Sequence, residues 1–161
     1  MNELKKTENN PISLGEISEE QTGHIDTDLL RILEKISDPE IPVLSIMDMG
    51  VVRSAVVKNN SVEIEITPTY SGCPAMDVIA DDIKAALKKE GYTAQVELVL
   101  APAWTTDWIT PRGRKALEDY GIAAPLNTEA DKEVLLNGKR LVKCTNCGSK
   151  NTKLILSLIH I

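Results

Sequence analysis

The sequence predicts an α+β fold in which helices pack on a small mixed sheet, in the order α-β-β-α-β-α. Three segments carry this prediction. Residues 51–67 form two strand-like runs around the tight-turn pair Asn59-Asn60. Residues 74–90 place apolar side chains at helical spacing, and residues 92–100 read as a third strand. A helical segment before the hairpin and another after the third strand complete the order.

The first elements are expected to be a short helix and an ordered loop. Asp26 or Thr27 can cap a helix that ends before Asp38-Pro39, because the residue before a proline avoids the α region. The apolar face of this helix consists of Leu29, Leu30, Leu33 and Ile36. The segment 38–50 contains two prolines and shows no period. We therefore expect a loop lined with apolar side chains.

The hairpin and the later helices have clear boundaries. Residues 61–67 alternate between apolar and polar side chains, which predicts a strand with one wet face. The helix over residues 74–90 begins among aspartates and ends among lysines, as the helix dipole favours, and Gly91 follows it as a C-cap. Thr110-Pro111 begins a last short helix, and Gly121 ends it.

A single cysteine, Cys73, lies where the second strand gives way to the long helix. Pro74 suits the first helical position, so Cys73 falls at or near the N-cap. Unpaired N–H groups and the dipole there stabilise a thiolate, the form of cysteine that binds metal or attacks an electrophile. A buried cysteine acting as a small apolar filler is the other interpretation. Asp77, one turn later, would oppose thiolate formation.

Two loops supply further candidates for binding residues. The loop before the hairpin holds Asp38, Glu40 and Asp48, whose carboxylates could bind a metal, although caps and turn formers are the simpler interpretation. The loop after the third strand could close over Cys73, because both would follow the C-terminal ends of strands. Its polar residues are Thr105, Thr106 and Asp107.

The two tryptophans of the loop after the third strand, Trp104 and Trp108, have two interpretations of their own. They cover an open edge of a small core, or they form an interaction surface, since Trp is enriched in interface hot spots.

Composition narrows the function classes. The chain has 161 residues and a net charge of −6, which argues against nucleic acid or an anionic membrane surface as its partner. No run approaches the roughly 18 apolar residues of a membrane-spanning helix, and the N-terminal segment lacks the apolar region of a signal peptide. The odd count of three cysteines does not suit a disulfide framework. We therefore expect a cytoplasmic protein.

The C-terminal segment contains half of a zinc site. Cys144 and Cys147 form a C-x2-C knuckle followed by glycine, whereas a structural zinc site needs four ligands. Residues 156–161 look like the translation of a sequencing adapter and are excluded from fold reasoning. The predicted organisation is a mobile tail (1–24), the α+β domain (25–123), a linker (124–139), a partial zinc ribbon (140–155) and the adapter artefact (156–161).

Several strings together resemble the small iron–sulfur-assembly domain family. They are the Asp-Pro-Glu-Ile-Pro run from residue 38, the Met-Gly-Val-Val-Arg run from residue 49 and the Ser-Gly-Cys-Pro turn from residue 71. The strings PTYSGCPAMD, APAWTTDWI and GRKALEDYGIAAP are similar to one branch, the D subunits of bacterial phenylacetyl-CoA epoxidases. The resemblance covers about residues 26–125, and CTNCGSKNT is similar to the start of that branch's zinc ribbon.

The resemblance implies an accessory or maturation subunit that assists delivery of iron or an iron–sulfur cluster. In that system other subunits carry the di-iron oxygenase and the flavin/iron–sulfur reductase, so these are the expected partners and catalysis by this chain is not expected. Cys73 would be the family's reactive cysteine, with Asp38 and Glu40 in the matching acidic loop. Cys144 and Cys147 would be two of four zinc ligands, and the missing second pair is a departure from the pattern.

Three hypotheses remain at this point. One thiolate cannot hold a cluster alone, so the maturation hypothesis needs a homodimer or a client to supply further ligands. A purely structural subunit, which handles no metal, is the second hypothesis. Thiol catalysis on a CoA substrate is the third, and it lacks a general base near Cys73 in the sequence.

Overall fold

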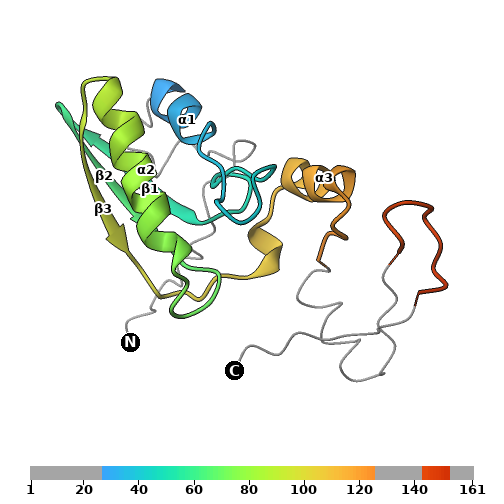
Figure 1. The fold of residues 1–161 in the computed structure, drawn as a ribbon. Coiled ribbons are helices and arrows are strands. Elements are labelled where there is room, and N and C mark those ends of the chain that lie inside the picture. Colours follow the sequence, from blue (N-terminus) through green and yellow to red (C-terminus); the bar gives the residue numbers. More distant parts are fainter. Residues whose placement is uncertain (1–26, 126–142, 153–161) are drawn as a thin grey trace, which may run out of the picture.

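The computed structural model describes residues 27–125 and 143–152 (Figure 1). Its helices and strands are α1 (Thr27–Leu33), β1 (Val52–Lys58), β2 (Ser61–Ile66), α2 (Ala75–Lys89), β3 (Thr93–Leu98), the 3-10 helix η1 (Thr106–Trp108) and α3 (Pro111–Tyr120). The predicted α+β class and the order of its elements are confirmed. Only η1 was not expected.

The three strands form a mixed sheet in the order β1-β2-β3. β1 and β2 are antiparallel and turn at Asn59, whose φ of 56° is the left-handed conformation that Asn tolerates. β2 and β3 are parallel, because α2 connects them and carries the chain back to the start of the sheet. The ends of β2 and β3 therefore lie at the same edge, together with the start of β1.

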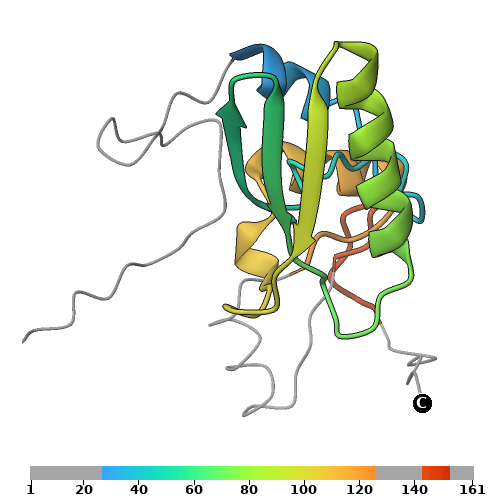
Figure 2. The same ribbon diagram turned by 90° about the vertical axis from the view of Figure 1, so that its left-hand side faces the viewer.

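The core lies between one face of the sheet and α2. Along β2 the apolar residues are buried while Glu63 is exposed, as the alternation predicts. Ile79, Ile83 and Leu87 on α2 are buried against this face, and each contributes about 1.5–3 kcal/mol of hydrophobic stabilisation. Figure 2 shows α2 lying along β3, and α1 packs against α2.

The helix α1 is shorter than the sequence predicts. It ends at Leu33. The amide of Glu34 still bonds four residues back, but the amides of Lys35 and Ile36 bond three residues back, to the carbonyls of Ile32 and Leu33. These are the tighter bonds of a 3-10 turn. The side chain of Ile36 is still buried, so the apolar pattern extended beyond the helix itself.

The loop from residue 38 to residue 50 is ordered and lined with apolar side chains, as expected. Its buried members are Leu44, Ile46, Met47 and Met49. The helix α3 packs on this loop at Gly113, where an added Cβ would lie 2.9 Å from a methyl carbon of Leu44. Only glycine allows so close an approach. Figure 1 shows α3 beside the loop, which lies between it and the sheet.

Several predicted segments lie outside the described residues. They are the tail (1–24), residues 126–139 of the linker, residues 140–142 and 153–155 of the ribbon, and the adapter-like end (156–161). Within residues 27–125 and 143–152, no helix has both the length and the apolar character needed to span a bilayer.

Candidate functional site

The turn that carries Cys73 connects β2 to α2. The amide of Cys73 donates to the carbonyl of Tyr70 at 3.3 Å, and Gly72 has a φ of +84°. This is the geometry of a type II turn, which needs glycine at its third position. Helix α2 begins at Ala75 with Pro74 as its N-cap, so Cys73 lies one residue before the cap.

The side chain of Tyr70 lies beside the thiol of Cys73. A hydrogen bond between the two raises the pKa of Tyr70; partial desolvation and the negative charges of Cys73 and Glu40 act in the same direction. Tyr70 is 54% exposed and Cys73 is half-buried, so both can be reached from solvent. Tyr70 was not identified from the sequence. The sequence could have indicated it, because Tyr70 lies three residues before Cys73 and a four-residue turn brings its first and last residues together.

The acidic loop faces this turn through Glu40. Asp38 is buried, and one of its carboxylate oxygens accepts the amides of Glu40 and Ile41, both at 2.8 Å. Asp38 therefore shapes the loop as a turn former. Glu40 is exposed, and its charge acts on Tyr70. The charge of Glu40 thus acts on Tyr70 in the Cys73 turn, and Asp38 shapes the loop that carries Glu40.

Sulfur, phenol and carboxylate together form a small set of metal-binding groups. Thiolates are the usual ligands of iron–sulfur clusters, and a carboxylate or phenolate oxygen can complete the shell of an iron ion. Among the described residues, no group of three or more His, Cys, Asp or Glu side chains could hold a metal ion. A metal at Cys73 would therefore need further ligands from outside this turn.

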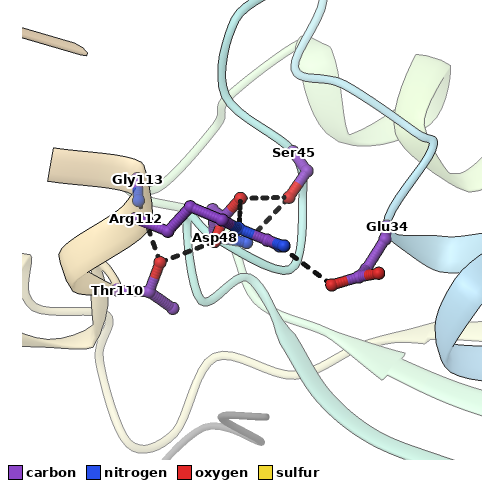
Figure 3. A network of polar contacts seen from close by, with 6 residues as sticks. All are labelled: Glu34, Ser45, Asp48, Thr110, Arg112 and Gly113. Atoms are coloured by element: carbon purple, nitrogen blue, oxygen red, sulfur yellow. Dashed lines mark hydrogen bonds and ion pairs between the residues drawn. The ribbon is translucent and has the colours of Figure 1, made fainter. Parts of the chain in front are cut away.

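Asp48 anchors the acidic loop to α3 (Figure 3). The hydroxyls of Ser45 and Thr110 donate to its carboxylate at 2.9 and 2.6 Å. Nε of Arg112 lies 3.0 Å from both carboxylate oxygens, and Nη2 of Arg112 bonds Glu34 at 2.9 Å. The contacts of Thr110 and Arg112 join residues more than 60 positions apart in the sequence.

The charge of Asp48 is fixed by these contacts. Burial raises the pKa of Asp48, but the hydrogen bonds from Arg112, Thr110 and Ser45 more than compensate, so its pKa lies below the ordinary value. A buried carboxylate that remains ionised and fully bonded is suited to holding the loop. This agrees with the interpretation of Asp48 as a structural residue.

The two tryptophans fasten the loop after β3 to the start of β1. The indole N–H of Trp104 donates to the carbonyl of Met49 at 3.0 Å. Trp108 abuts Gly50, where an added Cβ would lie 2.6 Å from the Trp108 carbonyl oxygen, and Arg53 stacks 4.0 Å from the centre of its ring. Trp104 therefore packs at the edge of the core, which was one of the two roles predicted for the tryptophans, whereas the ring of Trp108 stacks against Arg53.

The polar residues of this loop do not join Cys73. Thr106 and Asp107 lie on η1 and Thr105 is its N-cap. Figure 2 shows η1 on the β1 side of the sheet and the turn 67–74 on the α2 side. The loop crosses to β1 because its tryptophans pack there. A role of these three residues in binding stays a prediction.

Cys144 and Cys147 lie in a tight turn of the C-terminal segment. The amide of Gly148 donates to the carbonyl of Cys144 at 2.8 Å. The backbone N–H groups of Cys147 and Asn146 lower the pKa of Cys144, and the Cys147 thiol adds to this. Figure 1 places the knuckle on the far side of α3 from the Cys73 turn. The described residues supply two thiols, half of the tetrahedral set that structural zinc requires.

Comparison with known proteins identifies the family. The sequence model of the family described as "Iron-sulfur cluster assembly protein" matches residues 26–98, which include the acidic loop, the sheet and the Cys73 turn. The chain belongs to this family.

Its relatives include both an epoxidase component and maturation factors. The chain is 43% identical, over 77% of its length and 73% of the relative's, to the D subunit of the "Putative 1,2-phenylacetyl-CoA epoxidase" of Escherichia coli K12. It is 32% identical, over 55% of its length and 89% of the relative's, to "Fe-S protein maturation auxiliary factor YitW" of Bacillus subtilis. The crystal structure of a domain of unknown function, DUF59, from Bacillus anthracis is 30% identical with a TM-score of 0.52, covering 56% of this chain and 88% of that one.

Proposed function

We propose that this chain is an accessory subunit of a phenylacetyl-CoA epoxidase and assists delivery of iron or an iron–sulfur cluster to a partner subunit. Two kinds of relative support the proposal, an epoxidase component and several iron–sulfur maturation factors. The partner would be the oxygenase or the iron–sulfur flavin reductase of the same system. The free thiols and the negative net charge favour a cytoplasmic location and a protein partner.

The observation that carries the proposal is the exposed turn that presents Cys73 beside Tyr70 and Glu40. In this proposal the iron or cluster is cargo, and the Cys73 thiolate is its first ligand. Tyr70 donates a hydrogen bond to the sulfur, and Glu40 places negative charge at the cation. Positions that these groups leave open are available to ligands of the receiving subunit, or of a second copy of this chain.

A purely structural subunit is the second candidate. Cys144 and Cys147 would be two ligands of a zinc ribbon, and Tyr120 and Ile122 lie exposed at the end of α3. Thr145 of the knuckle donates to the carbonyl of Gly121, so the knuckle and these apolar side chains share one region. Such a region suits a permanent contact within a complex.

Co-expression with the oxygenase and reductase subunits distinguishes the two candidates. We would compare wild type, Cys73→Ser, Cys147→Ser and a strain without this chain. The readouts are iron and acid-labile sulfide in each purified partner, and phenylacetyl-CoA turnover.

The maturation proposal expects iron or sulfide, and turnover with it, to fall both without the chain and in Cys73→Ser. Cys147→Ser should retain cargo delivery. A Cys73→Ser sample equal to wild type, with activity lost only on deletion, would refute the proposal and favour a structural subunit.

A further inference from the structure

Cys144 and Cys147 take no part in the cargo delivery proposed above. They lie in a short turn that two backbone bonds close. The amide of Gly148 donates to the carbonyl of Cys144 at 2.8 Å, and the amide of Cys144 donates to the carbonyl of Ser149 at 2.9 Å. Both cysteines are free thiols. The backbone therefore holds two thiols within one closed turn.

The shape of this turn brings the two sulfurs together. The bond from the Gly148 amide to the Cys144 carbonyl spans four residues, which is a single helical turn. Residues three apart in a helical turn have Cβ atoms about 5–6 Å apart, whereas a disulfide needs Cβ atoms about 3.5–4.5 Å apart. The thiol of Cys147 already donates a hydrogen bond to the sulfur of Cys144. A small adjustment of the turn therefore suffices to join the sulfurs.

A disulfide in this turn would be open to reduction. None of residues 143–152 is buried, and Cys147 is exposed while Cys144 is half-buried. Thiol–disulfide exchange requires a thiolate to reach a sulfur atom, so exposed disulfides are the labile ones. A loop this short also gains little stability from its closure, because the stabilisation by chain entropy grows with the length of the loop. The pair is therefore suited to repeated oxidation and reduction.

The rest of the described chain adds no metal ligand to the pair. Within residues 27–125 and 143–152, no group of three or more His, Cys, Asp or Glu side chains could hold a metal ion. The third cysteine of the sequence, Cys73, lies in a turn on the other side of α3 (Figure 1). The described residues therefore give Cys144 and Cys147 the chemistry of a dithiol.

We propose that Cys144 and Cys147 form a reversible redox site that exchanges with a low-molecular-weight disulfide such as oxidised glutathione. One thiolate attacks a sulfur of the small disulfide, forms a mixed disulfide and releases one small thiol. The second thiolate attacks the protein sulfur of this mixed disulfide and releases the other small thiol. The protein gives up two electrons and two protons, and the small disulfide takes up both. This site is independent of the function proposed for Cys73.

Oxidation of the full chain in glutathione buffers tests the inference. The chain is treated with a reductant and a metal chelator, and then equilibrated without oxygen at one fixed ratio of oxidised to reduced glutathione. Two total concentrations of glutathione are compared, and free thiols are then blocked by alkylation. Trypsin, which cleaves after lysine and arginine, releases residues 144–150 with both thiols and residues 59–84 with Cys73. Mass spectrometry distinguishes the disulfide, the mixed disulfide and the alkylated thiol in each peptide.

We expect the peptide 144–150 to carry an internal disulfide. Its formation releases two glutathione molecules, so a tenfold dilution at the fixed ratio should raise the proportion of disulfide to dithiol about tenfold. Cys73 is the internal control, because a mixed disulfide releases one glutathione and its amount should not change on dilution. The remaining cysteine of Cys144→Ser or Cys147→Ser should behave like this control. Cys73→Ser should leave the oxidation of the pair unchanged.

Several outcomes would overturn the inference. One is a peptide 144–150 that carries mixed disulfides alone, or whose oxidised proportion does not respond to dilution. A disulfide to Cys73, or between two copies of the chain on a non-reducing gel, would exclude pairing within the turn. Zinc that remains with the purified chain during chelator treatment and keeps both thiols reduced would assign the pair as metal ligands instead.

Discussion

Replacing Asp48 by asparagine should release the acidic loop from α3. The substitution keeps the shape of the side chain and removes its charge. Asp48 is the common acceptor of Ser45, Thr110 and Arg112, and its side chain is only 11% exposed. An asparagine side chain offers one acceptor oxygen, so it cannot satisfy all three donors.

The expected cost follows from the kinds of bond that are lost. A hydrogen bond to a charged group contributes about 1.5–3 kcal/mol and a neutral one about 0.5–1.5 kcal/mol, so the two hydroxyl bonds lose about 2 kcal/mol together. The pair with Arg112 adds less than about 1 kcal/mol, because the guanidinium is 58% exposed and water screens it. We therefore expect Asp48→Asn to lower the free energy of unfolding by about 2–3 kcal/mol. In a domain of this size that is a fall in Tm of about 10–20 °C.

Urea unfolding followed by tryptophan fluorescence measures this loss, because Trp104 and Trp108 both contact the chain next to Asp48. Asp81→Asn is the matched control. It alters an exposed pair with Lys84 and should change stability by less than about 0.5 kcal/mol. A loss below about 1 kcal/mol in Asp48→Asn, or one equal to the control, would refute the anchoring role.

Stability should depend on pH through the same carboxyl group. The pKa of Asp48 lies below its ordinary value of 3.8 in the folded chain, so its contribution is complete above pH 3.8 and is lost as the pH falls through the lower folded pKa. The stability difference between wild type and Asp48→Asn should therefore narrow only below about pH 3.8. A difference that already narrows near pH 5 would contradict the lowered pKa.

Two further predictions concern the turns. Gly50→Ala places a Cβ 2.6 Å from the carbonyl oxygen of Trp108 at a φ of +71° and should cost about 2–4 kcal/mol. Gly72 has a φ of +84°, and an added Cβ there would meet no atom within 4 Å, so Gly72→Ala should lower the free energy of unfolding by only about 1–2 kcal/mol. Urea unfolding of both variants separates steric crowding from backbone strain. Equal losses of stability in the two variants would exclude a contribution from crowding at Gly50. Cys73→Ala should lower the pKa of Tyr70 towards its usual value, because the hydrogen bond that raises it most is gone. Titration of the absorbance of tyrosinate at 295 nm measures this shift, and an unchanged curve would place the phenol away from the sulfur.

The local elements of the fold could be predicted because their signals lie within each segment. The alternation of residues 61–66 and the helical period and capping of α2 are each complete within about 15 residues. The position of Cys73 relative to the N-cap of α2 was predicted to within one residue, which is the usual uncertainty in placing the end of a helix.

The contacts between distant segments could not be predicted in the same way. Arg112 and Asp48 are 64 positions apart in the sequence, and nothing in the residues around either one indicates that the two form a contact. The prediction that Thr105 would approach Cys73 used the shared edge of parallel strands, but it did not account for the tryptophans, which draw their loop towards β1. Tyr70 was missed because an exposed tyrosine in a turn has no periodicity that reveals its neighbour.

The incomplete set of metal-binding groups at Cys73 leads to a further prediction from the proposed function, namely that iron bound there is held only weakly. A resident metal is enclosed by a full set of ligands, whereas this turn offers one sulfur, an exposed phenol and an exposed carboxylate. We therefore expect wild-type chain reconstituted anaerobically with ferrous iron and sulfide to lose its iron to a chelator within minutes, and Cys73→Ser to take up less from the start. The same chain mixed with a docked client should instead pass the iron on before the chelator removes it, because ligands of the client complete the shell. Iron retained at one equivalent per chain against the chelator would refute the role as a carrier, because it would mean that Cys73 belongs to a permanent site whose remaining ligands come from this chain.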